Sequence, residues 1–377
     1  MSRRSTLVLL VALAFGCEEA AGSQASVSAQ PGGDAPAPSA AATALPAATA
    51  AASASASTAP SPDLEPWELP EPDVMGKTLA EQRALMLRRM RVMHELDDSQ
   101  LAALDAVLAK GKWTGQGNPD VVEHPLTRAQ CLAKRAEAGA KDLRAPVCGA
   151  PLMAPLYDPA TSGPEQAKVC IDRYEFPGMP CDYPVTWVST IQAHELCQAM
   201  GKRLCDAHEW EGGCAGALRS PEVEYPFGMP REAMEGVHNS RREKVWAYGA
   251  TKDHKKCATT SKQSSTCSAP GWKACGSNTF PAGSFPECKS SLGVYDQHGN
   301  AAEHMWLPRK ASELSALGGQ GIPEMKGSWF IFAQHEAHLD DCRWRAPGWH
   351  ANEGKQHLNY HLGFRCCKDV GAASAAP

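Results

Sequence analysis

The sequence predicts an α+β protein in which a helical hairpin precedes a domain with few regular elements and long loops. Helix-capping signals concentrate between Thr78 and Gly111. Farther along, a short strand pattern at Val169–Glu175 and a clear helix pattern at Thr190–Met200 lie close together. After Gly212 the chain is rich in Gly, Pro and Ser, a composition that favours loops.

The hairpin is predicted from two capping signals. Thr78-Leu79-Ala80-Glu81 is a capping box that opens a helix running to about Leu96, and Asp98 or Ser99 caps a second helix that ends at Gly111. We expect the apolar stripe of the first helix to pack on the main domain. A separate partner-binding surface is the alternative. The arginines of the first helix are expected to form a solvated face: Arg83, Arg88, Arg89 and Arg91.

A connecting region follows the hairpin. Thr127 is expected to cap a short helix through Ala138, and Cys131 and Cys148 are expected to close a local disulfide loop. The helix at Thr190–Met200 has an apolar inner side, formed by Ile191, Ala193, Leu196 and Cys197. The charged insert Lys252–Lys256 and the stretch Cys257–Cys288 have no periodicity, so they predict no regular element.

The first residues have the pattern of an export signal. Arg3 and Arg4 precede the apolar run Leu7–Phe15, which is too short to span a bilayer, and Gly16-Cys17 closes it. Small residues before a lone cysteine predict a lipoprotein signal peptide over residues 1–16 and lipidation of Cys17. An ordinary secretory signal is the alternative. We therefore expect an exported protein anchored by lipid to a membrane of a bacterial cell envelope.

Composition defines the other boundaries. Residues 17–63 are nearly all Ala, Ser, Pro, Gly and Thr, which bury too little apolar surface to order, so a disordered tether is expected. Residues 64–165 hold the hairpin and the connecting region. Residues 166–370 form the main domain, and residues 371–377 are expected to be a disordered tail.

Cysteine content and charge limit the class of protein. The chain has fifteen cysteines, and fourteen remain once Cys17 is set aside. An even number in an exported protein predicts disulfides, and without a Cys-x-x-Cys pair a metal cluster is the weaker interpretation. The net charge of -5 provides no basic field, so no nucleic-acid partner is expected.

Six short motifs occur in a fixed order in the second half of the chain. They are Gly201-Lys202-Arg203-Leu204, Glu209-Trp210-Glu211, Tyr225-Pro226-Phe227-Gly228, Tyr295-Asp296-Gln297-His298-Gly299-Asn300 with Glu303 just after, Gly327-Ser328-Trp329, and Leu362-Gly363-Phe364-Arg365-Cys366. Together they resemble the sulfatase-modifying-factor domain, the family of the formylglycine-generating enzyme. The resemblance covers about Ala167 to Asp369, and it implies a variant of the C-type-lectin fold.

The resemblance also implies two disulfides. The family pairs a cysteine of the first domain helix with the one that ends the Gly-Phe-Arg-Cys motif, which correspond here to Cys197 and Cys366. It pairs a cysteine after Glu-Trp-Glu with one near the C-terminal arginines, which correspond to Cys214 and Cys342. Both bridges close long loops, for which the chain-entropy model gives roughly 4–5 kcal/mol each.

A calcium site is the third implication of the resemblance. The family binds the ion through a side chain at Asp296, main-chain oxygens at Gly299 and Ala301, and the carboxylate at Glu303. A hard cation prefers several oxygen ligands, so the chemistry is coherent. The alternative is that Asp296 and Glu303 only cap turns.

The catalytic groups of the family do not carry over. Its oxidases bind copper(I) through two cysteines that lie just before the C-terminal arginines, and soft sulfur suits that ion. The equivalent stretch Phe332–Asp341 contains no cysteine, so copper is not expected. It contains instead imidazoles and carboxylates that could hold zinc or iron, or could be ordinary polar loop residues: His335, His338, Asp340 and Asp341.

Three functions remain open from the sequence. The first is a non-catalytic binding or scaffolding module that recognises a peptide, a glycan or an envelope protein. The second is an oxidoreductase of the formylglycine-generating class, and the third is another metal enzyme that uses the histidine cluster. The missing cysteine pair favours the first.

Overall fold

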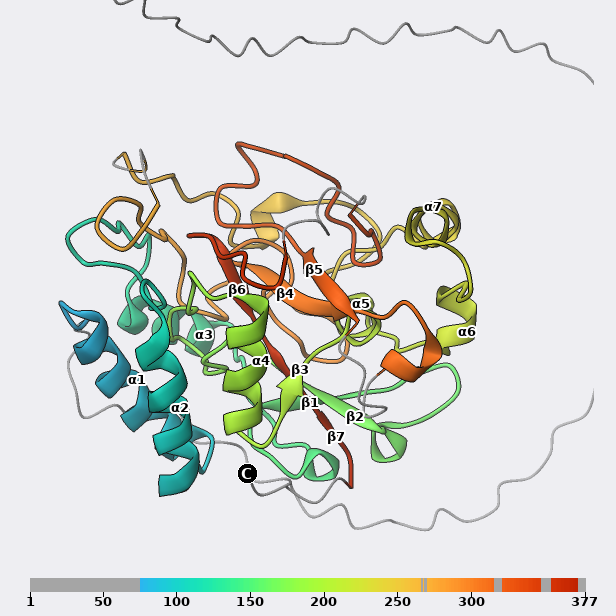
Figure 1. Ribbon diagram of the computed structural model, residues 1–377, viewed down its shortest axis with the longest axis horizontal. Helices are drawn as coiled ribbons and strands as arrows, with labels where there is room; N and C mark the ends of the chain where they lie inside the picture. Colours follow the sequence, from blue (N-terminus) through green and yellow to red (C-terminus); the bar gives the residue numbers. More distant parts are fainter. Residues whose placement is uncertain (1–74, 266, 268–269, 315–320, 347–353, 372–377) are drawn as a thin grey trace, which may run out of the picture. The chain divides into compact units, whose positions relative to one another are not determined.

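Two small sheets form the centre of the part of the chain that the structure describes. The computed structural model describes residues 75–265, 267, 270–314, 321–346 and 354–371 (Figure 1). The first sheet has the order β1-β2-β7-β3, and the second has the order β5-β4-β6. Their bounds are β1 Met153–Leu156, β2 Val169–Asp172, β3 Arg203–Leu204, β4 Ala302–Leu307, β5 Ile322–Lys326, β6 Leu362–Phe364 and β7 Cys366–Asp369. Short strands among several helices confirm the predicted α+β class.

A single residue joins the two sheets. β6 ends at Phe364 and β7 begins at Cys366, so Arg365 lies at the point where the chain leaves one sheet and enters the other. β4 pairs in parallel with β6 and antiparallel with β5, whereas all pairs of the first sheet are antiparallel. The Gly-Phe-Arg-Cys motif is therefore the junction of the domain.

Helices surround the sheets. They are α1 Leu79–Met93, α2 Asp98–Lys110, α3 Arg128–Glu137, α4 Thr190–Ala199, α5 Ala207–Ala215, α6 Pro221–Glu224 and α7 Arg231–Arg241. Thr78 and Thr127 cap α1 and α3 as expected, but α2 is capped by Asp97, whose carboxylate accepts a hydrogen bond from the Gln100 N–H. The expectation of loops after Gly212 is wrong at α6 and α7. Burial of Met234 and His238 stabilises α7 despite its polar sequence.

The hairpin packs on the domain, as expected. Figure 1 shows α1, α2 and α4 side by side, and α2 contacts both of the others. Apolar residues of both hairpin helices share one buried cluster with the domain: Met86, Met90, Leu101, Leu104, Leu108, Phe176, Leu196 and Phe364, among others. The apolar stripe of the first helix is therefore part of the domain core.

Arg89 is not solvated, contrary to the expectation for the arginines of α1. Its side chain is 3% exposed, and its Nε donates to Asp182 Oδ2 at 2.8 Å. Arg128 of α3 donates to the other oxygen of Asp182 at 2.6 Å. Burial alone would raise the pKa of Asp182, but the two guanidinium groups lower it to about 2. This buried carboxylate thus joins α1 and α3 to the domain.

All fourteen cysteines of the described residues form disulfides. The pairs are Cys131–Cys181, Cys148–Cys170, Cys197–Cys366, Cys205–Cys367, Cys214–Cys342, Cys257–Cys288 and Cys267–Cys275. Cys197–Cys366 and Cys214–Cys342 are the pairings that the resemblance implies. The local loop expected between Cys131 and Cys148 is wrong, because each pairs with a residue of the main domain instead.

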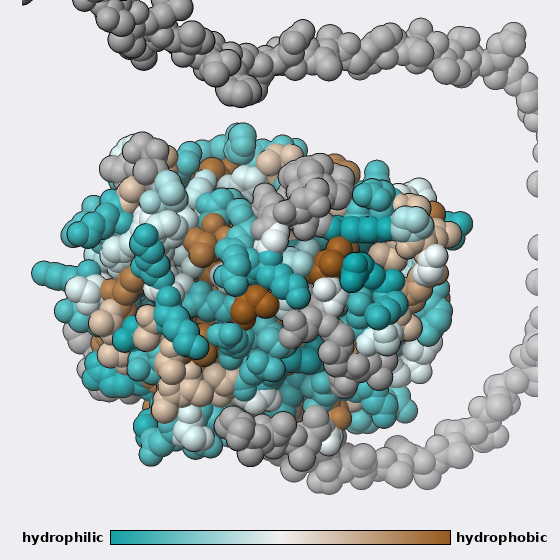
Figure 2. Space-filling view, viewed as in Figure 1, coloured by the Kyte–Doolittle hydropathy of each residue, from teal (hydrophilic) through white to brown (hydrophobic). Residues whose placement is uncertain are grey.

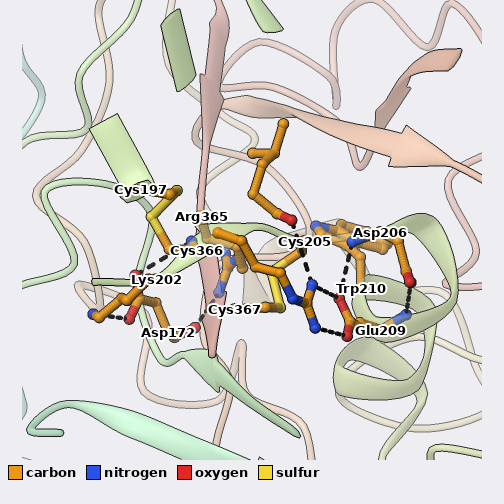
Figure 3. Close-up of a disulfide and its surroundings, with 12 residues drawn as sticks. Asp172, Cys197, Lys202, Cys205, Asp206, Glu209, Trp210, Arg365, Cys366 and Cys367 are labelled. Atoms are coloured by element: carbon orange, nitrogen blue, oxygen red, sulfur yellow. Dashed lines mark hydrogen bonds and ion pairs between the residues drawn. A yellow bond between two sulfur atoms is a disulfide. The ribbon is translucent and has the colours of Figure 1, made fainter. Parts of the chain in front are cut away.

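The adjacent cysteines Cys366 and Cys367 lie on opposite faces of β7, because successive side chains of a strand alternate. Figure 3 shows Cys366 bonded to Cys197 on one side of the strand and Cys367 bonded to Cys205 on the other. Each pair belongs to a different buried cluster of the core. β7 is thus covalently held from both faces.

The segments assigned to the signal peptide, the lipidated Cys17 and the tether all lie outside the described residues, as does the tail beyond Gly371. Among the helices that the structure describes, none is long and apolar enough to cross a membrane.

We expect Asp182→Asn to destabilise the protein by about 3–5 kcal/mol at pH 7, because it leaves two buried guanidinium groups without their counter-charge. Since the folded pKa lies below the ordinary aspartate pKa of 3.8, the contribution is full above that pH and is lost as the pH falls toward about 2. Urea unfolding at pH 7 and at pH 3 measures both effects.

The control for this prediction is Asp98→Asn, which removes an exposed partner of Arg91 and should change stability little. An Asp182→Asn protein as stable as the wild type at pH 7 would show that the ion pair does not hold the hairpin.

Candidate functional site

The candidate site is the loop Phe332–Asp341, where the sequence has imidazoles and carboxylates. The turn at Gly327 leads into it with a φ of 77°, and a Cβ there would lie 3.0 Å from the main-chain oxygen of Gln297. Ser328 then accepts a hydrogen bond from the Gly299 N–H at 2.9 Å, and its hydroxyl donates to Asp340 at 3.4 Å. The Gly-Ser-Trp motif therefore ties this loop to the Asp-Gln-His-Gly-Asn motif.

Aromatic and imidazole rings support the loop. Trp329, Phe330, Ile331 and Phe332 form a buried cluster. The His338 ring stacks on Trp344 with centroids 5.0 Å apart, and Trp329 stacks on His361 at 5.1 Å. Burial lowers the pKa of His338, so its imidazole is neutral at pH 7.

The four residues predicted as metal ligands are not brought together. His335 is exposed, and His338 lies against Trp344. Asp341 accepts from Nε and Nη2 of Arg242, both at 2.8 Å, whereas Asp340 is buried in a different environment. Three potential ligand atoms gather within 4.8 Å at two places in the described chain, and both consist partly of disulfide sulfurs, which offer no thiolate.

Asp340 is the centre of a polar cluster that the sequence did not indicate. The Trp246 indole donates to Oδ1 at 3.0 Å. His254 Nε2 and His298 Nδ1 lie 3.7 and 3.8 Å from Oδ2, and the Lys252 ammonium lies 3.8 Å from Oδ1. Trp246, Lys252 and His254 come from the charged insert and the residues just before it, where the sequence has no periodicity. The sequence identified His298 only as part of the motif Tyr295–Asn300, with no role of its own.

Cys342 has no free thiol in this structure. It forms a disulfide with Cys214, and His298 Nε2 lies 3.3 and 3.5 Å from the two sulfurs. The same nitrogen accepts a hydrogen bond from the Ala247 N–H at 3.1 Å. Burial lowers the pKa of His298 to about 4, so the ring is neutral at pH 7.

The residues of the expected calcium site have unequal freedom to bind an ion. Asp296 is buried, and its Oδ1 has no hydrogen-bond partner. An oxygen without a partner is available to coordinate a metal ion. Glu303 is different, because Arg365 donates to both of its oxygens at 2.5 and 2.7 Å and the Trp210 indole donates at 3.0 Å. The donor set therefore fits calcium at Asp296 but not at Glu303 as it is paired here. Calcium stays a prediction.

The surface has several hollows of moderate size. One of about 460 Å³ is lined by Trp246, Tyr248, Lys256 and Lys289, and another of about 520 Å³ lies between Leu156–Lys168 and Leu218–Val223. In the view of Figure 2 hydrophilic residues cover most of the surface, and hydrophobic residues are scattered among them. The described residues of that face therefore offer no broad apolar surface.

Comparison with known proteins identifies the domain. A family model described as the sulfatase-modifying factor enzyme 1-like domain matches residues 160–370. PvdO from Pseudomonas aeruginosa is similar in structure, with 16% identity, a TM-score of 0.30, and coverage of 58% of this chain and 90% of PvdO. CarF is similar with 12% identity, a TM-score of 0.32, and coverage of 58% of this chain and 96% of CarF. No curated protein matches the chain. Because the family match spans more than half of the chain, the protein belongs to the sulfatase-modifying factor enzyme 1-like family.

Proposed function

We propose that the protein is a lipid-anchored envelope protein whose sulfatase-modifying factor domain binds or scaffolds a partner and does not oxidise cysteine. The observation that carries the proposal is the disulfide between Cys342 and Cys214. Cys342 is the cysteine nearest to the loop Phe332–Asp341, and that loop has none of its own. The position of the family's reactive cysteine pair therefore offers no thiolate.

The chemistry of the remaining groups supports this proposal. Copper(I) is a soft ion that prefers thiolates, whereas the loop offers imidazoles and carboxylates, which suit borderline and hard ions. The residues present therefore do not fit copper. Family membership transfers the fold but not an activity whose reacting groups are absent.

A hollow beside the site is a candidate surface for the partner. Trp246 and Tyr248 supply flat apolar faces, and the Lys256 ammonium lies 5.8 Å from the centre of the Tyr248 ring. Glu287 lines the same hollow and lies 3.6 Å from the Lys256 ammonium, and the exposed Lys289 adds a second cation, so the positive charges outnumber the negative one. Aromatic faces beside cations suit a peptide or glycan that carries negative charge. An envelope protein that presents such a segment is an equivalent partner.

The anchor and the export route rest on the sequence alone. The basic start, the short apolar run and Gly16-Cys17 support lipidation of Cys17, and residues 17–63 support a flexible tether. Seven disulfides in the described domain suit an oxidising compartment outside the cytoplasm.

We expect the purified protein, supplied with copper(I) and oxygen, to leave a Cys-x-Pro-x-Arg peptide unoxidised, because no thiolate pair is available. Peptide mass spectrometry measures formylglycine directly, with an active oxidase of the family as the positive control. Alkylation without reduction should leave Cys342 unmodified. Copper-dependent turnover that disappears in Cys342→Ser would overturn the binding function and favour the oxidoreductase instead.

Replacing Cys17 with Ser should release the protein from the membrane fraction, because the acylated sulfur is the expected anchor. Cell fractionation followed by immunoblotting measures the distribution, and Ser23→Ala, which alters the tether alone, is the control. A Cys17→Ser protein that stays wholly in the membrane fraction would contradict lipid anchoring.

Calcium should raise the unfolding temperature of the wild type relative to EDTA, because Asp296 Oδ1 is a buried carboxylate oxygen that a cation can neutralise. Asp296→Asn should abolish the shift, whereas Glu137→Gln, at an exposed position of α3, should retain it. Equal unfolding temperatures of the wild type with calcium and with EDTA would remove calcium from the proposal.

A further inference from the structure

Two imidazole nitrogens face one buried carboxylate without forming a hydrogen bond to it. His254 Nε2 and His298 Nδ1 lie 3.7 and 3.8 Å from Asp340 Oδ2, beyond hydrogen-bonding distance. Both nitrogens are buried, and neither has a side-chain hydrogen-bond partner, although the His298 ring also contacts the main chain of Asp340. Asp340 is itself only 1% exposed at its side chain. A closed network of hydrogen bonds would have satisfied these atoms, so the cluster is incomplete as a purely protein structure.

The two histidines differ in what they can do. His298 Nε2 accepts the Ala247 N–H, so in the neutral ring Nδ1 carries the proton and points toward Asp340. Because it carries the proton, that nitrogen cannot bind a metal. His254 Nε2 has no such restriction, because it is buried without a hydrogen-bond partner and its lone pair is available in the neutral ring.

Two carboxylates lie at ligand spacing from His254 Nε2. Its Nε2 lies 3.4 Å from Glu336 Oε1 and 3.7 Å from Asp340 Oδ2. Two ligands bound to zinc at about 2.1 Å in tetrahedral geometry are about 3.4 Å apart. The oxygens of Glu336 and Asp340 that face His254 are more than 4.8 Å apart in this structure. Glu336 is 48% exposed at its side chain, so it can turn toward Asp340 to complete the set.

We propose that His254, Glu336 and Asp340 form a binding site for a divalent metal ion of the zinc class. One imidazole and two carboxylates suit a borderline or hard divalent ion. Glu336 at the exposed edge provides the entry path. The site includes Asp340 but not His335, His338 or Asp341, and it stands whether or not the domain binds a partner.

The Lys252 ammonium lies near both carboxylates of the proposed site, so it competes with a metal ion for them. This ammonium forms an ion pair with Glu336 and lies 3.8 Å from Asp340 Oδ1. The Lys252 side chain is 32% exposed, so it can swing into solvent when a metal ion arrives. Removing this ammonium should therefore strengthen metal binding, an effect that a purely structural ion-pair cluster would not produce.

Zinc titration of the full chain by isothermal calorimetry, after treatment with EDTA, tests the proposal. The wild type should take up zinc, and His254→Ala and Glu336→Gln should each weaken binding at least tenfold. Lys252→Ala should tighten it. The matched control is His335→Ala, which removes an exposed histidine of the same loop and should leave zinc binding unchanged.

Unfolding temperatures measured in EDTA show that each variant is folded. Glu336 and Lys252 are partly exposed, so their replacement does not remove a core residue. The proposal is wrong if neither the wild type nor Lys252→Ala takes up zinc. It is equally wrong if His254→Ala and Glu336→Gln bind zinc as tightly as the wild type does.

Discussion

The ion pair between Arg365 and Glu303 holds the two sheets of the domain together. Arg365 lies between β6 and β7, is fully buried, and donates all five of its N–H groups. Two go to Glu303 of β4, and the others go to the main-chain oxygens of Asp172, Arg173 and Tyr295. A buried guanidinium is tolerated only when it is paired and fully hydrogen-bonded, so these partners cannot be replaced singly without cost. Arg365 thereby links β4 of one sheet to the main chain at the end of β2 in the other.

The same ion pair affects what the domain can bind. Because Glu303 neutralises Arg365, its carboxylate is not free to act as an independent ligand, whereas Asp296 keeps a buried carboxylate oxygen without a hydrogen-bond partner. The disulfides likewise make their cysteines unavailable for binding or reaction. Cys342 lies beside the reactive position of the family, but its bond to Cys214 turns it into part of the framework. The domain thus keeps the family fold, and the loop Phe332–Asp341 contains no cysteine.

For the hairpin, the helical pattern predicted the helices and their packing but not the burial of individual charged residues. The capping boxes and the apolar stripe predicted α1 and its packing, because capping hydrogen bonds join residues three apart and the stripe has a local period. The pattern could not distinguish Arg89 from its exposed neighbours. Its partner Asp182 lies 93 residues away, and only folding brings the two charges together. The local disulfide predicted for Cys131 and Cys148 was wrong for a related reason. Two cysteines close in sequence need not be in contact, and each of these pairs with a residue of the main domain.

The sequence by itself determined the family, the α+β class, the first helices and two of the disulfide pairs. These depend on local capping, on periodicity, or on motifs whose order is visible in one dimension. Only the tertiary structure decided which charges and ring nitrogens meet. His254, Glu336 and Asp340 come from an insert without periodicity and from a distant loop, and their positions depend on the buried cluster Trp329–Phe332 and on Ser328. Long-range packing sets such distances, and no local pattern records them.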